Sequence, residues 1–426
     1  MRMKSQCLSA MGRRTTEPPI SWLMATALAN PRLISLAAGF TDQATLPVDE
    51  TQTIVQDLLR SSTAGPAALQ YGTTIGDPIL RELTTLRLKH LDAAPRSSPA
   101  LSSERMVITN GSQQMLYMLT EALCDPGDIV LVEDPSYFVY LGILQSHGVH
   151  ARGLRMEHDG IDVAHLERTL RVLKREGKLA RVKLLYLVSY YQNPTGITTS
   201  FEKKRLILEL LRNCEGAAGH PLYLLEDAAY RELRFHGKDI KSALAVDPSG
   251  ERVIYTGTYS KPFATGARVG FGLLPKPVFT PVVRIKGNHD FGSSNLLQQL
   301  LARALSSGLY ESHLAILRNR YTQKAKTMRK HLQQNFPTAV AWREPEGGLY
   351  FWARLPHPLK SGSKSKLFQE ALRKGVLYVP GQLCYAEDPS RPRPNNEMRL
   401  SFGAATERNI CTGIERLGKV LHKLVR

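Results

Sequence analysis

The run Thr258-Tyr259-Ser260-Lys261 places a lysine among small hydroxyl side chains, and Arg268 follows just beyond Gly266. A lysine amine can form an imine with an aldehyde, while a hydroxyl and a guanidinium can together bind a phosphate. The amine reacts only if its pKa falls well below about 10.4, and a nearby cation such as Arg268 favours that shift. The segment therefore indicates a site for an aldehyde cofactor that carries a phosphate. The alternative is a lysine in a solvated loop.

Two further segments carry polar groups that suit the ring of such a cofactor. The apolar run 222–225 leads towards Asp227, whose carboxylate could pair with a protonated ring nitrogen, and Tyr230 could reach a ring oxygen. The turn Asn193-Pro194-Thr195-Gly196 follows another apolar run, and its asparagine could hydrogen-bond a phenolate oxygen. The alternatives are a helix-capping surface pair at Asp227 and Tyr230, and a plain turn at Asn193.

A fourth segment could hold the phosphate. The run Asn110-Gly111-Ser112-Gln113 joins an expected strand to an expected helix. Exposed backbone N–H groups at the start of a helix, with a hydroxyl beside them, form an anion site. The alternative is an ordinary helix cap, in which serine is common.

Short β-rich runs alternate with amphipathic stretches over most of the chain, which is typical of α/β folds. We expect strands over 106–109, 129–133, 182–188, 222–225, 253–255 and 269–274, with a helix from 111 to about 123. The polar candidates come just after several of these strands, where ligand crevices form in open α/β sheets.

A long helical stretch from about 295 to 334 separates this region from strand-like segments near 340, 349–355, 376–379 and 398–402, with a helix near 365–374. The pattern predicts a smaller α+β domain after the large one. We expect a basic, flexible arm over 1–30, an N-terminal segment over 31–60 that contributes to the small domain and the substrate site, a large domain over 61–300 that binds the cofactor, and the small domain over 301–426.

The composition narrows the classes of partner. The formal net charge is +18, but the basic residues are spread along the chain without a zinc-finger or RNA-binding signature, so we expect anionic small molecules rather than nucleic acid. The five cysteines include no CxxC, so no disulfide framework or metal site is indicated and a reducing cytoplasm fits best. No stretch approaches the roughly 20 apolar residues of a membrane-spanning helix.

Together these segments resemble the fold-type-I aminotransferases of classes I and II, which use pyridoxal 5′-phosphate (PLP). The resemblance spans residues 35 to 405 and looks closest to the 2-aminoadipate and kynurenine aminotransferase branch. It is carried by ordered motifs: Leu69-Gln70-Tyr71-Gly72 with Gly76, Gly111-Ser112-Gln113-Gln114, Glu133-Asp134-Pro135-Ser136-Tyr137, Gln192-Asn193-Pro194-Thr195-Gly196, Asp227 with Tyr230, Ser260-Lys261 with Arg268, Glu346-Gly347-Gly348, Val379-Pro380-Gly381 and Met398-Arg399-Leu400-Ser401-Phe402.

The resemblance implies an α/β fold with a mostly parallel seven-stranded sheet between helices. It also implies that Lys261 holds PLP as an internal aldimine and moves the proton at the substrate Cα. Asp227 would keep the pyridine nitrogen protonated, so that the ring accepts electrons from Cα. The other implied cofactor contacts are Ser112 and the Gln113 backbone at the phosphate, Tyr137 stacked on the ring, Asn193 and Tyr230 at the ring oxygen, and Ser260 and Arg268 at the phosphate.

The resemblance further implies the substrate contacts and the partners. Arg399 would grip the substrate α-carboxylate as a bidentate fork, and Gly39 and Asn193 would lie beside the substrate. Tyr71 would reach the phosphate and substrate of the neighbouring subunit, which implies a homodimer with shared active sites. The implied reaction is ping-pong transfer of an amino group from an L-amino acid to a 2-oxo acid, with 2-oxoglutarate as the expected acceptor.

Two departures from the family pattern leave the amino donor open. The family often has Gly-x-Pro where this chain has Gly39-Phe40-Thr41, and the run 189–192 before the Asn-Pro turn is unusually aromatic. A PLP-dependent β-lyase or decarboxylase on the same fold is an alternative. A PLP-sensing transcription regulator is a third, although the roughly 30 residues before the first family-like segment are fewer than a winged helix needs.

Overall fold

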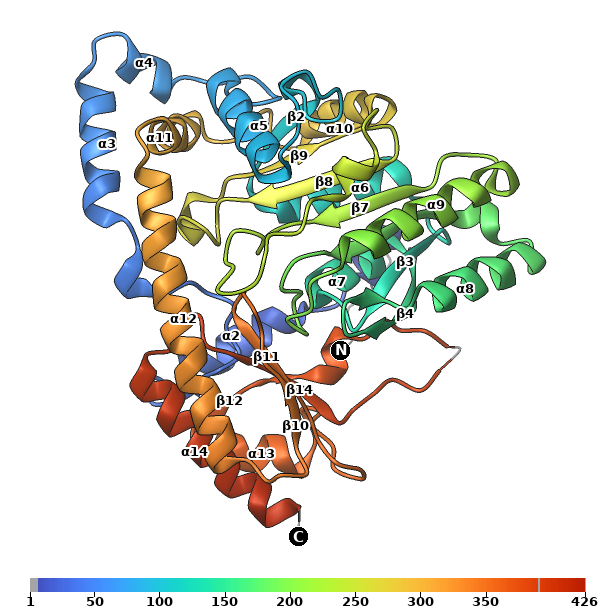
Figure 1. Cartoon of the computed structure of the whole chain (residues 1–426), viewed down its shortest axis with the longest axis vertical. Helices are drawn as coiled ribbons and strands as arrows, with labels where there is room; N and C mark the ends of the chain where they lie inside the picture. The colour runs from blue at the N-terminus through green and yellow to red at the C-terminus, as the bar shows by residue number, and fades with distance from the viewer. Residues whose placement is uncertain (1–6, 390, 426) are drawn as a thin grey trace.

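The computed structural model describes residues 7–389 and 391–425, and its largest feature is an eight-stranded sheet. The strands are β2 (Met106–Thr109), β3 (Ile129–Asp134), β4 (His150–Glu157), β5 (Gly160–Ile161), β6 (Val182–Val188), β7 (Tyr223–Asp227), β8 (Val253–Thr258) and β9 (Gly270–Leu273). Their order is β2-β9-β8-β7-β6-β3-β4-β5 (Figure 1). The strand β9 pairs antiparallel with β2 and β8, and β5 pairs antiparallel with β4, whereas the other neighbours are parallel. The mostly parallel α/β sheet is thus confirmed, and the two-residue β5 adds one strand to the seven expected.

Helices cover both faces of this sheet (Figure 1). One layer contains α6 (Gly111–Leu123), α7 (Phe138–His147) and α10 (Lys276–His289), and the other contains α5 (Pro78–Asp92), α8 (Val163–Arg175) and α9 (Phe201–Ala218). Parallel strands covered on both faces are continuously apolar rather than alternating. The strand β6 follows that rule, because all its residues except Lys183 are buried.

Four more helices lie towards one side of the molecule: α3 (Val48–Arg60), α4 (Ala64–Leu69), α11 (Asn295–Ser306) and α12 (Leu309–Asn335). Figure 1 shows α12 running from the level of the large sheet to the C-terminal region. The single helix expected from 295 to 334 is therefore two helices. The break comes at Gly308, whose φ of 78° lies in the left-handed region that glycine tolerates best.

The C-terminal region is a smaller α+β unit, as predicted. Its four-stranded sheet has the order β10-β11-β14-β13. The bounds are β10 (Ala341–Arg343), β11 (Tyr350–Arg354), β13 (Val379–Pro380) and β14 (Glu397–Ser401), with the helices α13 (Lys366–Arg373) and α14 (Glu407–Leu424). A two-stranded parallel sheet joins β1 (Ile34–Ser35) to β12 (Val376–Leu377), so the N-terminal segment lies beside this unit.

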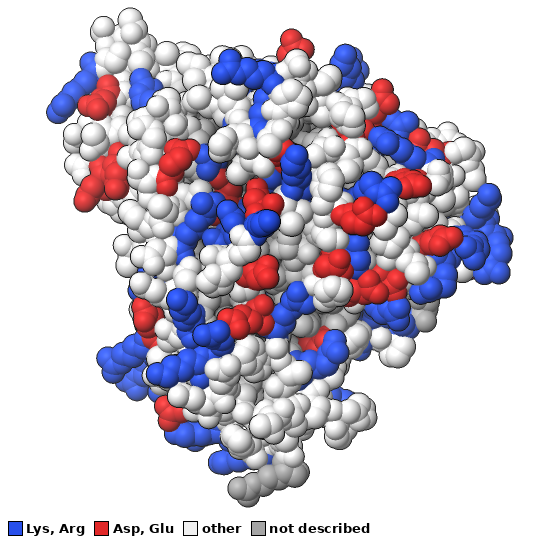
Figure 2. All heavy atoms as spheres, viewed as in Figure 1, with Lys and Arg blue, Asp and Glu red and all other residues white. Residues whose placement is uncertain are grey.

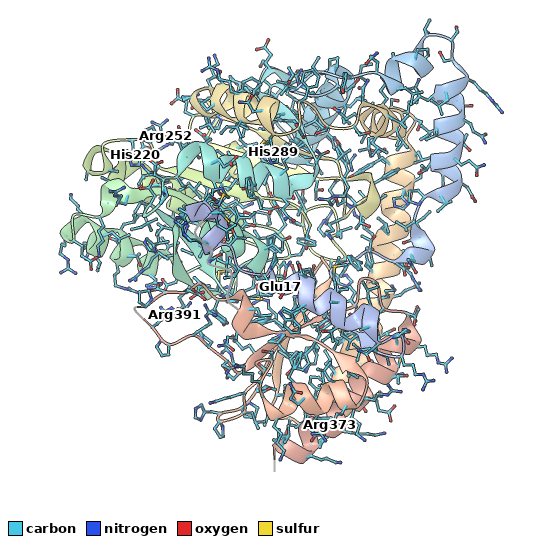
Figure 3. The ribbon with its side chains drawn as sticks, turned by 180° about the vertical axis from the view of Figure 1, so that it is seen from behind. Glu17, His220, Arg252, His289, Arg373 and Arg391 are labelled. Carbon is cyan, nitrogen blue, oxygen red and sulfur yellow. The ribbon has the colours of Figure 1, made fainter. Side chains whose placement is uncertain are left out.

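The described part of the N-terminal arm differs from the flexible segment that we expected. It forms α1 (Ala10–Arg14) and α2 (Pro19–Ala29), while residues 1–6 lie outside the described range. Leu23 is buried, and the Trp22 ring packs edge-on against Phe368 of α13. Figure 3 shows α2, with Glu17 just before it, lying along the C-terminal unit. The apolar residues of α2 thus form a face that packs against the C-terminal unit. The basic composition of the arm does not indicate such packing.

The surface shows no single charged field on the face drawn in Figure 2. Basic and acidic side chains are interspersed across its middle, with more basic ones towards the right edge and the lower left. All five cysteines are free. Within the described ranges, none of the helices has the length and apolar character needed to cross a membrane.

Candidate active site

A cavity of about 90 Å³ lies where β6, β7 and β8 end, beside the first turn of α6. Two wall residues, Val188 and Ala229, are apolar and carried no chemical signal in the sequence. The predicted residues that line the cavity are Ser112, Gln113, Tyr137, Asn193, Asp227, Tyr230, Ser260, Lys261 and Arg268. Segments far apart in the sequence therefore meet at one edge of the sheet.

Cationic and hydroxyl groups gather at one end of the cavity. The Nη1 of Arg268 donates to Ser260 Oγ at 3.4 Å, and its Nη2 donates to the Asn110 carbonyl at 3.4 Å. Gly111 has a φ of 73°, and a Cβ there would lie 2.8 Å from Arg268 Nη2, so only glycine lets the guanidinium approach the start of α6 this closely. Ser112 follows in the first turn. A guanidinium, two hydroxyls and a helix N-terminus form a site suited to a phosphate.

Asp227 lies in the same cavity at the end of β7 and is only 3% exposed. Among the described residues its partners are Tyr186, whose hydroxyl donates to Oδ2 at 3.0 Å, and the Ala229 N–H, which donates to Oδ1 at 3.0 Å. Neither partner is a cation, and burial raises the pKa of Asp227 to about 6. A buried carboxylate in this position stabilises a cationic ligand group such as a protonated ring nitrogen.

Lys261 supplies the amine of the cavity. Its Nζ donates to the carbonyl oxygen of Gly39 at 2.8 Å. Burial, and then the nearby guanidinium groups of Arg399 and Arg268, lower the pKa of Lys261 to about 8. An amine with this pKa is partly neutral near neutral pH, so it can act as a nucleophile and as a base.

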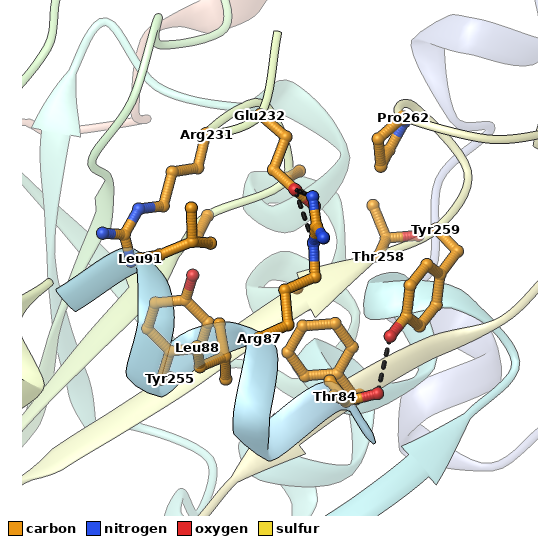
Figure 4. A pocket seen from close by; sticks show the side chains of 14 residues that line it. Thr84, Arg87, Leu88, Leu91, Arg231, Glu232, Tyr255, Thr258, Tyr259 and Pro262 are labelled. Atoms are coloured by element: carbon orange, nitrogen blue, oxygen red, sulfur yellow. Dashed lines mark hydrogen bonds and ion pairs between the residues drawn. The ribbon is translucent and has the colours of Figure 1, made fainter. Parts of the chain in front are cut away.

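A second, smaller cavity of about 20 Å³ is lined by Thr258, Tyr259 and Pro262 of the segment that carries Lys261 (Figure 4). There the Tyr259 hydroxyl is 2.6 Å from Thr84 Oγ1 of α5, and Arg87 of the same helix is ion-paired with Glu232. Arg87 is also ion-paired with Glu311, so its charge is already matched by carboxylates of this chain. We therefore assign this cavity a supporting role for the Thr258–Lys261 run rather than a ligand.

We predict that the reactivity of Lys261 rises with pH through about 8. Only the neutral amine attacks an aldehyde, and the lowered pKa sets the pH at which half of the amine is neutral. In cofactor-free protein, the rate of reductive labelling of Lys261 should climb between pH 7 and 9 and then level off, as followed by mass spectrometry of the labelled peptide. A midpoint near 10.4, the value of a solvated lysine, would contradict the burial argument.

Arg399 on β14 lies beside the cavity rather than in its wall. Its Nη1 donates to Asn193 Oδ1 and its Nη2 to the Ala37 carbonyl, both at 2.6 Å. The guanidinium is 4.3 Å from the centroid of the Tyr350 ring. Among the described residues its buried Nε has no hydrogen-bond partner. A buried guanidinium with an unsatisfied N–H, next to Lys261, suits the carboxylate of an amino acid.

We predict that Arg399→Lys raises the KM for the amino acid by about 10- to 100-fold with a smaller change in kcat, because a lysine cannot reproduce the planar fork. Steady-state kinetics over a range of amino-acid concentrations measure the split. Arg354→Lys on the neighbouring strand β11, where the side chain is 67% exposed, is the matched control and should leave KM unchanged. An unchanged KM in Arg399→Lys would show that Arg399 does not bind the carboxylate of the amino acid.

Three more predicted side chains, those of Tyr137, Asn193 and Tyr230, line the cavity. The Tyr230 hydroxyl is 2.9 Å from the Tyr350 hydroxyl, and Asn193 Nδ2 donates to Tyr230 at 3.5 Å. Tyr137 is partly buried in the wall, and desolvation there raises the pKa of its hydroxyl. Tyr350 was not predicted from the sequence, although it comes two residues after the Glu346-Gly347-Gly348 motif, which is a signal that could have indicated it.

The two remaining predicted residues lie outside the cavity wall. Gly39 contacts Lys261 as described above, and a Cβ at Gly39 would lie 2.6 Å from the Tyr350 hydroxyl. Tyr71 is 82% exposed and packs edge-on against Phe291, with ring centroids 5.3 Å apart. The structure therefore brings Gly39 to the site and does not bring Tyr71 to the cavity of its own chain.

Comparisons with known proteins agree with this geometry. A family model described as aminotransferase class I and II matches residues 31–417. An aromatic-amino-acid aminotransferase of Thermococcus litoralis is 33% identical over 91% of this chain and 88% of its own length. A 2-aminoadipate transaminase of Thermus thermophilus is 31% identical over 93% of this chain and 91% of its own. The crystal structure of Pyrococcus horikoshii kynurenine aminotransferase in complex with PMP superposes with a TM-score of 0.89 at 30% identity, covering 99% of this chain and 98% of that one.

Proposed function

This chain belongs to the class I and II aminotransferases, a family that works with PLP, and we propose that it transfers the amino group of an L-amino acid to a 2-oxo acid. The proposed acceptor is 2-oxoglutarate, and the two substrates use the same site in turn, in a ping-pong cycle. The observation that carries the proposal is the convergence of Lys261, Asp227 and Arg268 in one cavity, with Arg399 beside it. These groups match a cofactor with an aldehyde, a basic ring nitrogen and a phosphate.

The residues present fit PLP, which supplies an aldehyde for covalent attachment and a protonated ring that accepts electrons from the substrate Cα. We propose that Lys261 attaches the cofactor and later moves the proton at Cα. Asp227 holds the proton on the ring nitrogen, because its buried carboxylate lacks a cation within the described chain. Arg268, with Ser260 and Ser112, binds the phosphate.

The remaining residues orient the ring and the substrate in this proposal. Asn193 and Tyr230 would hydrogen-bond the ring oxygen, and Tyr137 would pack against the ring. Arg399 would hold the α-carboxylate, and Lys261, whose pKa it lowers, would take the proton from Cα. Burial of these groups excludes water, which strengthens their electrostatic interactions.

We further propose that the protein works as a homodimer that shares its active sites. Tyr71 and Phe291 are 82% and 53% exposed and lie beside Leu69, which is 69% exposed. Clustered exposed apolar side chains mark interaction surfaces. In such a dimer Tyr71, which is remote from its own cavity, reaches the phosphate and the substrate in the partner's cavity.

Product analysis tests the proposed reaction. Purified protein with bound PLP is incubated with each member of a panel of L-amino acids, with and without 2-oxoglutarate, and the products are identified by mass spectrometry. The proposal predicts equimolar glutamate and the donor's 2-oxo acid over many turnovers when 2-oxoglutarate is present. Without 2-oxoglutarate, no more than one equivalent of the donor's 2-oxo acid per bound cofactor should form. The panel also identifies the donor side chain, which neither Phe40 nor the buried Tyr190 and Tyr191 decide.

Two outcomes would favour the alternatives instead. Release of carbon dioxide or of a β-substituent without 2-oxoglutarate would identify a decarboxylase or a β-lyase. Turnover of no donor, together with retardation of DNA at physiological salt, would favour a PLP-sensing regulator.

A further inference from the structure

The loops that follow β3 and β6 carry Tyr137 and Asn193 into the cavity from two sides. Because β3 and β6 are neighbours in the sheet, these loops emerge side by side. Gln192 precedes Asn193 and is fully buried between the two loops. Its side chain does not line the cavity, and the proposed reaction gives it no role.

The Gln192 amide bonds both loops at once. Its Nε2 donates to Glu133 Oε2 at 2.7 Å and to the Pro135 carbonyl at 3.0 Å. Its Oε1 accepts from the backbone N–H and the hydroxyl of Thr195. All the bonding capacity of the amide is therefore used, with two bonds to the β3 side and two within its own turn.

Glu133, at 0% exposure, is the acceptor that orients this amide. Its Oε2 accepts a second bond from the Val188 N–H at 2.9 Å, and among the described residues its Oε1 has no hydrogen-bond partner. Burial, reinforced by the nearby Asp227 carboxylate, raises the pKa of Glu133 to about 8. The carboxyl is then largely uncharged at neutral pH. It stabilises the two loops by accepting two N–H hydrogen bonds rather than through its charge.

We propose that Glu133 and Gln192 are positioning residues that hold Asn193 and Tyr137 at the cofactor ring. This inference rests on the proposed function. With the turn fixed, Asn193 accepts from Arg399 through Oδ1, and Nδ2, which donates one N–H to Tyr230, keeps a second N–H for the ring oxygen. A donor on that oxygen opposes protonation of the adjacent lysine–cofactor linkage, because it stabilises negative charge on the oxygen.

The test follows the visible absorbance of the bound cofactor as a function of pH. Gln192→Ala should raise the midpoint of the absorbance change by about one pH unit, since the hydrogen bond from Asn193 is misaligned. Thr195→Val removes one of the two bonds to Gln192 Oε1 and should produce a smaller shift in the same direction. Glu133→Ala should resemble Gln192→Ala, whereas Glu133→Gln keeps the acceptor oxygen and should retain the wild-type midpoint.

Asp128→Ala is the matched control, because Asp128 is equally buried but precedes β3, at the other end of that strand, where it accepts from the Asp125 N–H at 2.9 Å. It should lower the thermal midpoint of the protein and leave the absorbance midpoint unchanged. The proposal is overturned if the absorbance midpoint does not shift in Gln192→Ala, or if it shifts equally in Asp128→Ala. It is also overturned if the midpoint shifts as far in Glu133→Gln as in Glu133→Ala. A wild-type protein that gains no visible absorbance with PLP would instead sink the proposed function itself.

Discussion

Replacing Lys261 with alanine is expected to lower kcat/KM by about 10⁴-fold or more and to abolish covalent attachment of the cofactor. The cavity loses its amine, whose pKa of about 8 allows both attack on an aldehyde and proton transfer at Cα. The other phosphate and ring contacts remain, so the variant should still bind PLP reversibly. Steady-state rates measure the loss of turnover, and borohydride reduction followed by gel filtration measures the loss of attachment.

Lys286→Ala is the matched control for this loss. Lys286 is a buried lysine on α10 that donates to Asp290 and does not line the cavity. Its removal should reduce stability but leave the cofactor attached and the rate close to that of the wild type. A Lys261→Ala variant that still retained cofactor after borohydride reduction would show that another amine carries it.

The second large effect is expected at Asp227. Asp227→Asn keeps the size of the side chain but removes the negative charge that stabilises a protonated ring nitrogen, and we expect kcat to fall by about 10³-fold. The cofactor should remain bound, because Arg268 and Lys261 are untouched. Absorbance spectra measure cofactor content, and single-turnover rates with an amino acid measure the chemical step.

Tyr186→Phe separates the contribution of a hydrogen bond to Asp227 from that of the charge of Asp227. It removes one of the two hydrogen bonds to the Asp227 carboxylate without changing its charge, so the rate should fall by less than about tenfold. Equal losses in the two variants would mean that the hydrogen bond rather than the charge matters. Near-normal turnover in Asp227→Asn would place the partner of the ring nitrogen elsewhere.

The buried strands could be predicted from the sequence because their apolar runs are continuous. The bounds of β2 and β6 agree with the predicted ranges 106–109 and 182–188. The strand β4 escaped prediction, since His150, Arg152, Arg155 and Glu157 interrupt its apolar pattern and the strand is only partly buried near the edge of the sheet. The packing of α2 also escaped, because it depends on a partner in α13 that is remote in sequence.

The cavity could be predicted because its residues follow strands whose ends share one edge of the sheet. Asp227 is the last residue of such a strand, and Lys261 and Asn193 each come shortly after one. The contacts of Arg399 with the Ala37 carbonyl and of Lys261 with the Gly39 carbonyl could not be predicted. Both contacts join residues that are far apart in the chain through a backbone carbonyl oxygen. Because every residue has a backbone carbonyl, the sequence does not indicate which one will accept.

The account's central claim is that Lys261 carries the cofactor, and peptide mapping tests it most directly. The protein is loaded with PLP, reduced with borohydride, digested and analysed by mass spectrometry. We predict a pyridoxyl phosphate adduct on the peptide that contains Lys261, at close to one equivalent per chain. A reduced adduct on any other lysine, with Lys261 unmodified, would contradict the account.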